Sequence, residues 1–165
     1  ISIDSNWGNS LKTYIAYTYL DATVSKNYSK RLTTTTDGDT STEIQTINSG
    51  NKIPGISKSS LYGEAQWSYT PIGFSTAVEA NWRSKYYATD LNDSPSLAKS
   101  FVAANIRAGF NQKINNWNLS EFIRVNNVFD KNYVGSVIVN ESNSRFFEPA
   151  PERNWLLGAN ASYQF

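Results

Sequence analysis

The strongest constraint on the fold is a two-residue periodicity that changes phase at a proline. Over residues 61–70, apolar or small side chains occupy the odd positions and mainly polar ones the even positions. After Pro71, over residues 72–82, the apolar side chains occupy the even positions. Successive side chains of a β-strand point to opposite faces, so a change of parity across a turn keeps both apolar sets on one face. The pattern predicts two antiparallel strands joined by a tight turn at residues 70–73.

The same alternation recurs along the rest of the chain. Residues 102–111, 117–126 and 155–165 each alternate apolar with polar side chains. Residues 11–24 are rich in Tyr and Thr and also favour a strand, but both of its faces carry apolar groups, so its orientation stays open. Residues 1–4 resemble the end of one more strand. The sequence therefore predicts an all-β chain of about seven antiparallel strands.

The connections between the predicted strands alternate in length. Those near Gly8, Pro71 and Asn115 are tight, and they are followed by long connections. Short turns at one end and long loops at the other are typical of antiparallel outer-membrane barrels. The predicted strands have roughly 10 to 14 residues, and a tilted strand needs about 9 to 11 to cross the hydrocarbon of a membrane. The long connections are residues 25–57, 88–97 and 130–152.

The two faces of the predicted strands favour a transmembrane β-barrel over a soluble β-sandwich. One face carries aromatic side chains close to the turns, the level at which Trp and Tyr anchor a barrel in the membrane interface. The alternative is a sheet whose aromatic face packs on another protein layer. Glu121 falls on the apolar face of its strand, which indicates a bulge or an error of register. The charged residues of the other face are Glu64, Glu79, Arg83, Lys85, Arg107 and Arg124.

Composition excludes several classes of function. The 165 residues include no His and no Cys, and the formal net charge is +1. Without His and Cys, the chain lacks the usual general base, the thiolate nucleophile and the common ligands of zinc and haem. We therefore expect no enzymatic activity, no metal site and no cofactor. The near-neutral charge gives no reason to expect nucleic-acid binding, and no apolar run approaches the ~18 to 20 residues of a transmembrane helix.

The last residues resemble the terminal strand of bacterial outer-membrane proteins. Residues 157–165, LGANASYQF, end on Phe165 with Tyr163 two positions earlier. In those proteins the two aromatic residues are recognised by the barrel-assembly machinery, so the resemblance implies that Tyr163 and Phe165 form an assembly signal. Asn160 stands where the pattern usually has glycine.

Other segments narrow the resemblance to the TonB-dependent receptors. Residues 127–133, NVFDKNY, resemble the N-L-F-D-K-x-Y signature of that family, with Val128 in place of the usual leucine. Residues 145–153, RFFEPAPER, are similar to the segment that precedes its last strand. Residues 17–22, YTYLDA, and residues 50–55, GNKIPG, also look like this family. Together the segments extend the resemblance over nearly the whole chain.

The resemblance implies that residues 1–165 are the C-terminal segment of a 22-stranded transmembrane barrel, without the plug domain. Such receptors lie in the bacterial outer membrane and take up a ferric siderophore, a vitamin or a similar scarce nutrient. The implied partners are outer-membrane lipid, the barrel-assembly machinery, the transported ligand, and the TonB complex acting through a part outside this chain. Because open sheet edges do not persist in lipid, we expect no transport by this chain alone.

Two other functions stay open from the sequence. A self-contained eight-stranded outer-membrane barrel with a structural or adhesive role would need a complete first strand, and residues 1–4 are too short for one. A soluble carbohydrate-binding module would stay in solution without detergent and would leave the terminal aromatic residue without a reason.

Candidate ligand-binding residues are arginine and aromatic side chains near the outer rim or inside the barrel, where they suit an anionic aromatic chelate. Alternatively, the inner charges contact water or the plug, and the rim residues belong to a girdle or to loop packing. Residues 33–36 are expected in a mobile external loop. Residues 37–39 are expected to form a solvated turn rather than a Ca²⁺ site. The candidates are Arg83, Tyr86, Tyr87, Arg107, Arg145 and Phe146.

Overall fold

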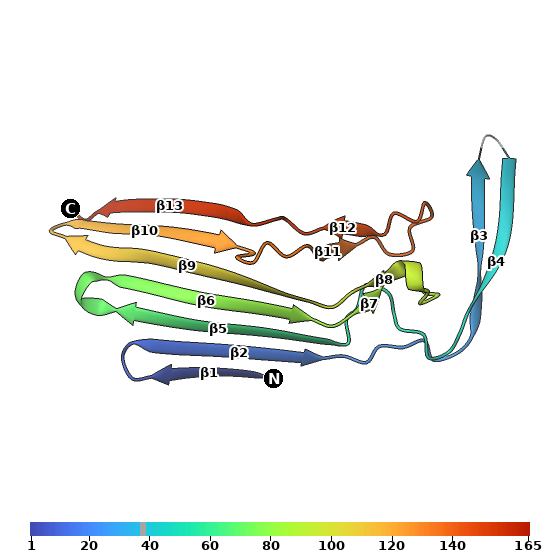
Figure 1. Cartoon of the computed structure of the whole chain (residues 1–165), viewed down its shortest axis with the longest axis horizontal. Coiled ribbons are helices and arrows are strands. Elements are labelled where there is room, and N and C mark those ends of the chain that lie inside the picture. The colour runs from blue at the N-terminus through green and yellow to red at the C-terminus, as the bar shows by residue number, and fades with distance from the viewer. Residues whose placement is uncertain (37–38) are drawn as a thin grey trace.

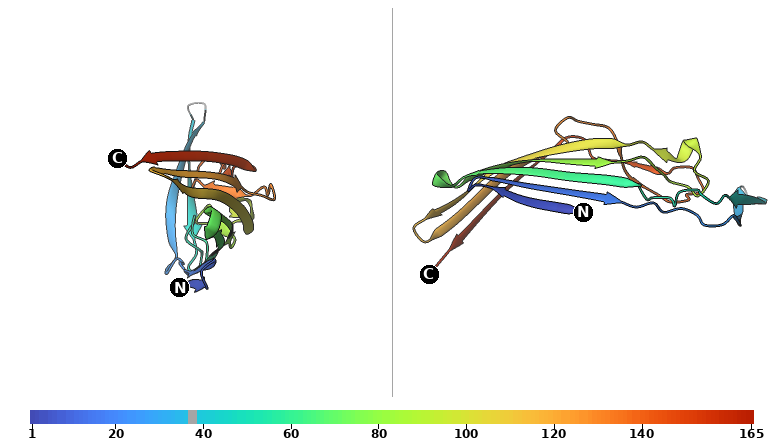
Figure 2. Two further views of the ribbon diagram at one scale, coloured as in Figure 1. Left: turned by 90° about the vertical axis from the view of Figure 1, so that its left-hand side faces the viewer. Right: turned by 90° about the horizontal axis from the view of Figure 1, so that it is seen from below.

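The computed structural model describes residues 1–36 and 39–165, and it is built around one twisted antiparallel sheet (Figures 1 and 2). Seven strands form this sheet in the order β1-β2-β5-β6-β9-β10-β13. The predicted all-β barrel-type architecture is confirmed. The strands are β1 (Ser2–Trp7), β2 (Leu11–Tyr19), β5 (Ser59–Tyr69), β6 (Phe74–Arg83), β9 (Phe101–Ile114), β10 (Trp117–Asn126) and β13 (Asn154–Tyr163).

The remaining elements lie in the long connections, apart from η1 in the β5–β6 turn. Figure 1 shows the tight turns at one end of the sheet, hereafter the turn end, and the paired short strands at the other, the loop end. Within the described residues, no helix is long and apolar enough to cross a bilayer. The remaining elements are β3 (Tyr28–Thr36) with β4 (Asp39–Ile47), β7 (Tyr86–Tyr87) with β8 (Leu97–Ala98), β11 (Val134–Val137) with β12 (Phe147–Pro149), and the 3₁₀ helices η1 (Thr70–Ile72) and η2 (Ser94–Ser96).

Gly73 closes the predicted turn between β5 and β6. Its φ is +68°, and its N–H donates to the carbonyl oxygen of Thr70 at 3.0 Å. A Cβ atom at this position would lie 1.9 Å from the backbone oxygen of Asn111. Only glycine combines a left-handed backbone with this close approach of a neighbouring strand.

The register separates the side chains into two unlike faces, because residues directly opposite each other point to the same side of a sheet. Val78 lies opposite Ile106, whereas the next residue, Glu79, lies opposite Glu64. We call the side of Val78 the apolar face and the side of Glu79 the polar face. The register also orients β2, which the sequence left open: Ile15 lies on the apolar face, opposite Gly63, and Tyr14 on the polar face, opposite Glu64.

Solvent exposure is the reverse of that in a soluble sandwich. Val78 is 53% exposed and Ile106 is 40% exposed, although both lie in the middle of the sheet. Glu79, on the other face of the same strand, is only 6% exposed. A soluble sandwich buries its apolar face against a second layer. An uncovered apolar face opposite a polar one is instead the arrangement of a membrane barrel wall.

The first long connection contains regular structure that the sequence did not predict. Residues 33–36, expected in a mobile loop, are the end of β3 and pair with β4. Threonine is β-branched and favours extended backbone, which explains why a Thr-rich segment forms a hairpin. Figure 1 shows the hairpin standing apart from the main sheet. Of the predicted turn at residues 37–39, Asp37 and Gly38 lie outside the described residues.

β2 is shorter than the sequence predicted. It ends at Tyr19 instead of Val24, because the following residues bond to the segment before β5. The N–H of Leu20 donates to the Lys58 carbonyl at 2.9 Å, and the N–H of Val24 donates to the Asn51 carbonyl at 2.8 Å. The chain thus leaves the main sheet before the hairpin begins.

Candidate functional site

A row of aromatic rings borders the apolar face at the turn end. The ring of Phe74 lies 5.1 Å from that of Phe110 and 6.1 Å from that of Trp67, measured between centroids. Further along the row, the rings of Trp117 and Tyr163 are 5.2 Å apart. These are positions at which the sequence predicts an aromatic girdle, and the sheet brings them side by side.

A second set of aromatic residues lies on the same face toward the loop end. Trp82 and Tyr17 both lie opposite Leu61, and Trp155 lies opposite Val125. In β6, Trp82 follows Phe74 by eight positions, which is about 26 Å at the usual rise of a strand. Membrane barrels carry an apolar band about 25 Å tall between two aromatic girdles. Because barrel strands are tilted by about 40°, this stretch spans about 20 Å along the membrane normal, close to the height of that band.

The C-terminal residues continue the strand pairing at the turn end. Tyr163 lies opposite Trp117 in β10, and the N–H of Gln164 donates to the carbonyl of Asn116 at 2.9 Å. The ring of Phe165 is 5.2 Å from the ring of Tyr163. Both aromatic residues thus lie in the turn-end row. Their role as an assembly signal remains a prediction.

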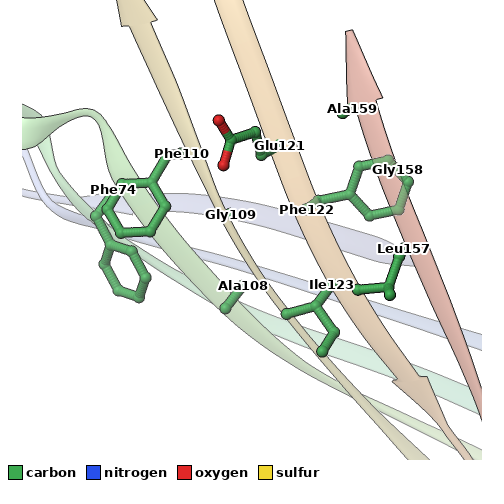
Figure 3. A pocket seen from close by; sticks show the side chains of 10 residues that line it. All are labelled: Phe74, Ala108, Gly109, Phe110, Glu121, Phe122, Ile123, Leu157, Gly158 and Ala159. Carbon is green, nitrogen blue, oxygen red and sulfur yellow. The ribbon is translucent and has the colours of Figure 1, made fainter.

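Glu121 lies on the apolar face, as its parity in the sequence indicates. It lies opposite Phe110 and Ala159 in an unbroken register, so there is no bulge and no error. Figure 3 shows it beside a groove of about 610 Å³ that is otherwise lined by apolar residues such as Phe74 and Leu157. A carboxylate in this position is unfavourable in lipid, although less so than Lys or Arg.

Replacing Glu121 with leucine is expected to raise the free energy of unfolding by about 1 kcal/mol, because an acidic group leaves the apolar face. Urea titration of the full-length protein folded in phospholipid vesicles measures the change. Glu152→Leu, at an exposed position outside the sheet, is the control and should change the stability by less than about 0.5 kcal/mol. A loss of stability in Glu121→Leu would show instead that the carboxylate has a favourable partner on this face.

Four charged side chains form a network on the polar face, across β5, β6, β9 and β10. Arg124 donates from both terminal nitrogens to the two carboxylate oxygens of Glu79, each at 2.6 Å. Arg107 donates from Nη2 to Oε1 of Glu64 at 2.6 Å, and its Nε lies 3.7 Å from Oε1 of Glu79. Two cations and two anions compensate one another. The candidate Arg107 is therefore engaged within the barrel wall.

The NVFDKNY segment forms a closed turn. Asn127 has a φ of +51° and is buried. Its Oδ1 accepts from the N–H of Lys131 at 2.9 Å, and its Nδ2 donates to the carbonyls of Lys131 and Pro151 at 3.0 and 3.3 Å. Oδ1 of Asp130 accepts from the N–H of Arg153 at 2.8 Å. The segment thus ties the end of β10 to the residues that enter β13, which is a structural role.

The YTYLDA and GNKIPG segments meet at the loop end. The carboxylate of Asp21 accepts from Nζ of Lys52 at 2.6 Å and from Nζ of Lys58 at 3.0 Å. These hydrogen bonds hold the pKa of the Asp21 carboxyl below its usual range. The N–H of Gly50 donates to the carbonyl of Val24 at 2.8 Å. Both segments therefore fix the base of the hairpin β3–β4.

The first three candidate ligand-binding residues lie where β6 enters its loop. The guanidinium carbon of Arg83 lies 5.5 Å from the centre of the Tyr86 ring, a cation–π contact. Tyr86 is 3% exposed, and within the described part of the chain its hydroxyl has no hydrogen-bond partner. The carbonyl of Tyr87 accepts from the N–H of Gly55 at 2.8 Å. The structure thus brings Arg83 and Tyr86 together.

The other candidates lie elsewhere. Arg145 and Phe146 belong to the connection between β11 and β12, where the side chain of Arg145 is exposed and that of Phe146 is buried. The ring of Phe146 packs edge-on against Phe147, with 6.2 Å between the centroids. Arg107 is in the middle of the sheet. The six residues therefore do not form one site, and their part in ligand binding remains a prediction.

A cavity that the sequence did not predict opens at the loop end. Its volume is about 630 Å³, and its lining includes Lys99, Phe101, Lys131, Tyr133 and Phe147. The rings of Phe101 and Tyr133 are stacked, with centroids 4.1 Å apart and planes inclined by 22°. Tyr133 belongs to the NVFDKNY segment and Phe147 to the RFFEPAPER segment, so the two family-like segments are the signals that could have pointed here. Periodicity could not, because the lining combines the start of β9 with two separate connections.

The fold and these two faces define a class of structure: part of an antiparallel β-barrel wall with one apolar and one polar face. The chain is similar to the siderophore receptor PiuA from Acinetobacter baumannii, with 22% identity over 96% of this chain and 20% of that one and a TM-score of 0.72. No family profile matches the sequence.

Two further solved structures have the same fold. The ferric citrate transporter FecA, in its unliganded form, shares 14% identity over 92% of this chain and 21% of that one, with a TM-score of 0.65. The ferric-catecholate import receptor Fiu from E. coli K12 shares 16% identity over 96% of this chain and 19% of that one, with a TM-score of 0.59. Similarity at these identities establishes a shared fold. The resemblance predicted from the sequence is therefore confirmed as a resemblance of fold. The chain spans about a fifth of the length of the proteins it matches.

Proposed function

We propose that this chain is part of a TonB-dependent receptor of the bacterial outer membrane that takes up a ferric siderophore or a similar scarce nutrient. The observation that carries the proposal is the uncovered apolar face, bordered by aromatic residues and opposite a charged face. The three similar proteins are a siderophore receptor, a ferric citrate transporter and a ferric-catecholate import receptor, which supports iron-chelate uptake as the function.

The partners follow from the same surfaces. Lipid would cover the apolar face, and the barrel-assembly machinery would recognise Tyr163 and Phe165. The TonB complex would act through a part of the receptor outside this chain. The main sheet is open, since β1 and β13 do not pair with each other in the described residues. An open sheet of seven strands favours a segment of a larger barrel over a self-contained eight-stranded barrel.

The test is iron-limited growth of a bacterial strain that lacks its own ferric-chelate receptors and expresses the full-length protein. We expect the protein in the outer-membrane fraction, and growth on at least one ferric chelate of a panel that includes citrate, catecholate and hydroxamate complexes. Growth should stop when the TonB complex is inactivated, because uptake would lose its energy source. Recovery of the protein in the soluble fraction, or growth that does not depend on TonB, would contradict the proposal.

A further inference from the structure

The cavity at the loop end opens on the polar face of the sheet. Phe101, the first residue of β9, lies opposite Arg83 of β6, and both therefore project from the polar side. The ring of Tyr133 stacks on that of Phe101 and so lies on the same side. In a barrel the polar face lines the interior, and the cavity would lie at the mouth of that interior. This is the position that an entering ligand reaches first.

The charge at this cavity is positive and uncompensated. Lys99 and Lys131 line the cavity together with uncharged residues, and no acidic side chain is part of the lining. Neither lysine forms an ion pair within residues 1–36 and 39–165, and the same is true of Arg83, opposite Phe101. The charges of the network in the middle of the sheet, by contrast, are matched one to one. The uncompensated cations indicate an anionic ligand.

The aromatic side chains in the lining are a second guide to the chemistry of the ligand. Phe101 and Tyr133 form a parallel stack, and Phe147 from β12 contributes a third ring that is 40% exposed. Rings held in this way can stack on a planar ring of a ligand. The volume of about 630 Å³ lies within the range of about 300 to 1,000 Å³ that small-molecule sites usually have.

We infer that this cavity is a ligand subsite for an aromatic ring bearing negatively charged oxygens, of the kind found in catecholates and aromatic carboxylates. The ring would stack beside Phe101 and Tyr133, and Lys99 and Lys131 would donate charge-assisted hydrogen bonds to the oxygens. Arg83, one of the six candidate ligand-binding residues predicted from the sequence, lies beside the subsite. The inference rests on the proposed function and specifies the chemistry of the ligand.

The test is a binding titration of the purified full-length protein in detergent, followed by quenching of tryptophan fluorescence. The first probe is the iron(III) complex of 2,3-dihydroxybenzoate, which is aromatic and anionic, and the second is ferric citrate, which is anionic but not aromatic. We expect the aromatic complex to bind more tightly. The double variant Lys99→Gln/Lys131→Gln should bind it about tenfold more weakly, and raising the salt concentration should affect this variant less than the wild type.

Tyr133→Leu tests the aromatic contribution separately. It should weaken binding of the dihydroxybenzoate complex by about two- to tenfold and leave ferric citrate unaffected, while Tyr133→Phe should keep most of the affinity. Lys113→Gln at the turn end and Phe129→Leu, an exposed ring outside the cavity, are the matched controls and should bind like the wild type. Unchanged near-ultraviolet circular dichroism would show that the variants are folded.

The possible results distinguish a failure of the inferred subsite from a failure of the proposed function. If the wild type binds the aromatic complex and both cavity variants bind it equally well, the subsite is wrong while the function stands. If the wild type supports TonB-dependent growth but prefers ferric citrate, the inferred ligand chemistry is wrong. If it binds neither probe and supports no growth on any chelate of the panel, the proposed function itself fails.

Discussion

Replacing Asn127 with alanine is expected to lower the free energy of unfolding by about 3 kcal/mol. The side chain makes three hydrogen bonds to the main chain, two to Lys131 and one to Pro151. Because Asn127 is buried, the groups left behind would lose partners without regaining water. Alanine would also have to adopt a φ of +51°, which costs it about 1 kcal/mol. Urea titration of the full-length protein in vesicles measures the loss.

Asn115→Ala is the matched control for this prediction. Asn115 has a φ of +53° in the tight turn between β9 and β10, and it is exposed to solvent. Replacing Asn115 with alanine therefore incurs the cost of a left-handed backbone but breaks no hydrogen bonds like those of Asn127. The expected loss of unfolding free energy is only about 1 kcal/mol. Equal losses in the two variants would show that the NVFDKNY turn depends on backbone conformation alone.

The strands and their faces could be predicted because the information is local. A two-residue period places each side chain on one face, and short turns fix the register of neighbouring strands. Glu121 shows how strictly this holds: its parity put a carboxylate on the apolar face, and the structure places it there. The same reasoning left β2 unoriented, because both of its faces carry apolar side chains and only pairing with β5 decides between them.

The candidate site was less accessible to prediction, because its contacts depend on residues that are far apart in the chain. The partner of Arg107 is Glu64, 43 positions earlier, and no local pattern connects them. Stacking of Tyr133 on Phe101 likewise requires the connection after β10 to return over the start of β9. The family-like motif at residues 127–133 could be detected in the sequence. The hydrogen bonds of Asn127 show that this motif closes a turn, which is a structural role and not evidence of ligand binding.

Replacing Glu79 with alanine is expected to cost about 2 to 3 kcal/mol of unfolding free energy. Its carboxylate accepts two hydrogen bonds from Arg124 and lies 3.7 Å from Nε of Arg107. These two arginines are directly opposite each other in β9 and β10. Without the carboxylate between them, two like charges would face each other on one side of the sheet, which is destabilising. The expected loss is below that of a fully buried pair, because the side chain of Arg124 is still 26% exposed.

The pairwise origin of this loss can be tested with a double variant. Removing Arg124 as well as Glu79 eliminates the facing charges, so the double variant should lose less stability than the sum of the two single variants. Raising the salt concentration should reduce the loss in Glu79→Ala, because salt screens the repulsion between the arginines. Additive losses that do not change with salt would mean that Glu79 stabilises the barrel wall by packing. In that case the charges on the polar face would not form one coupled network.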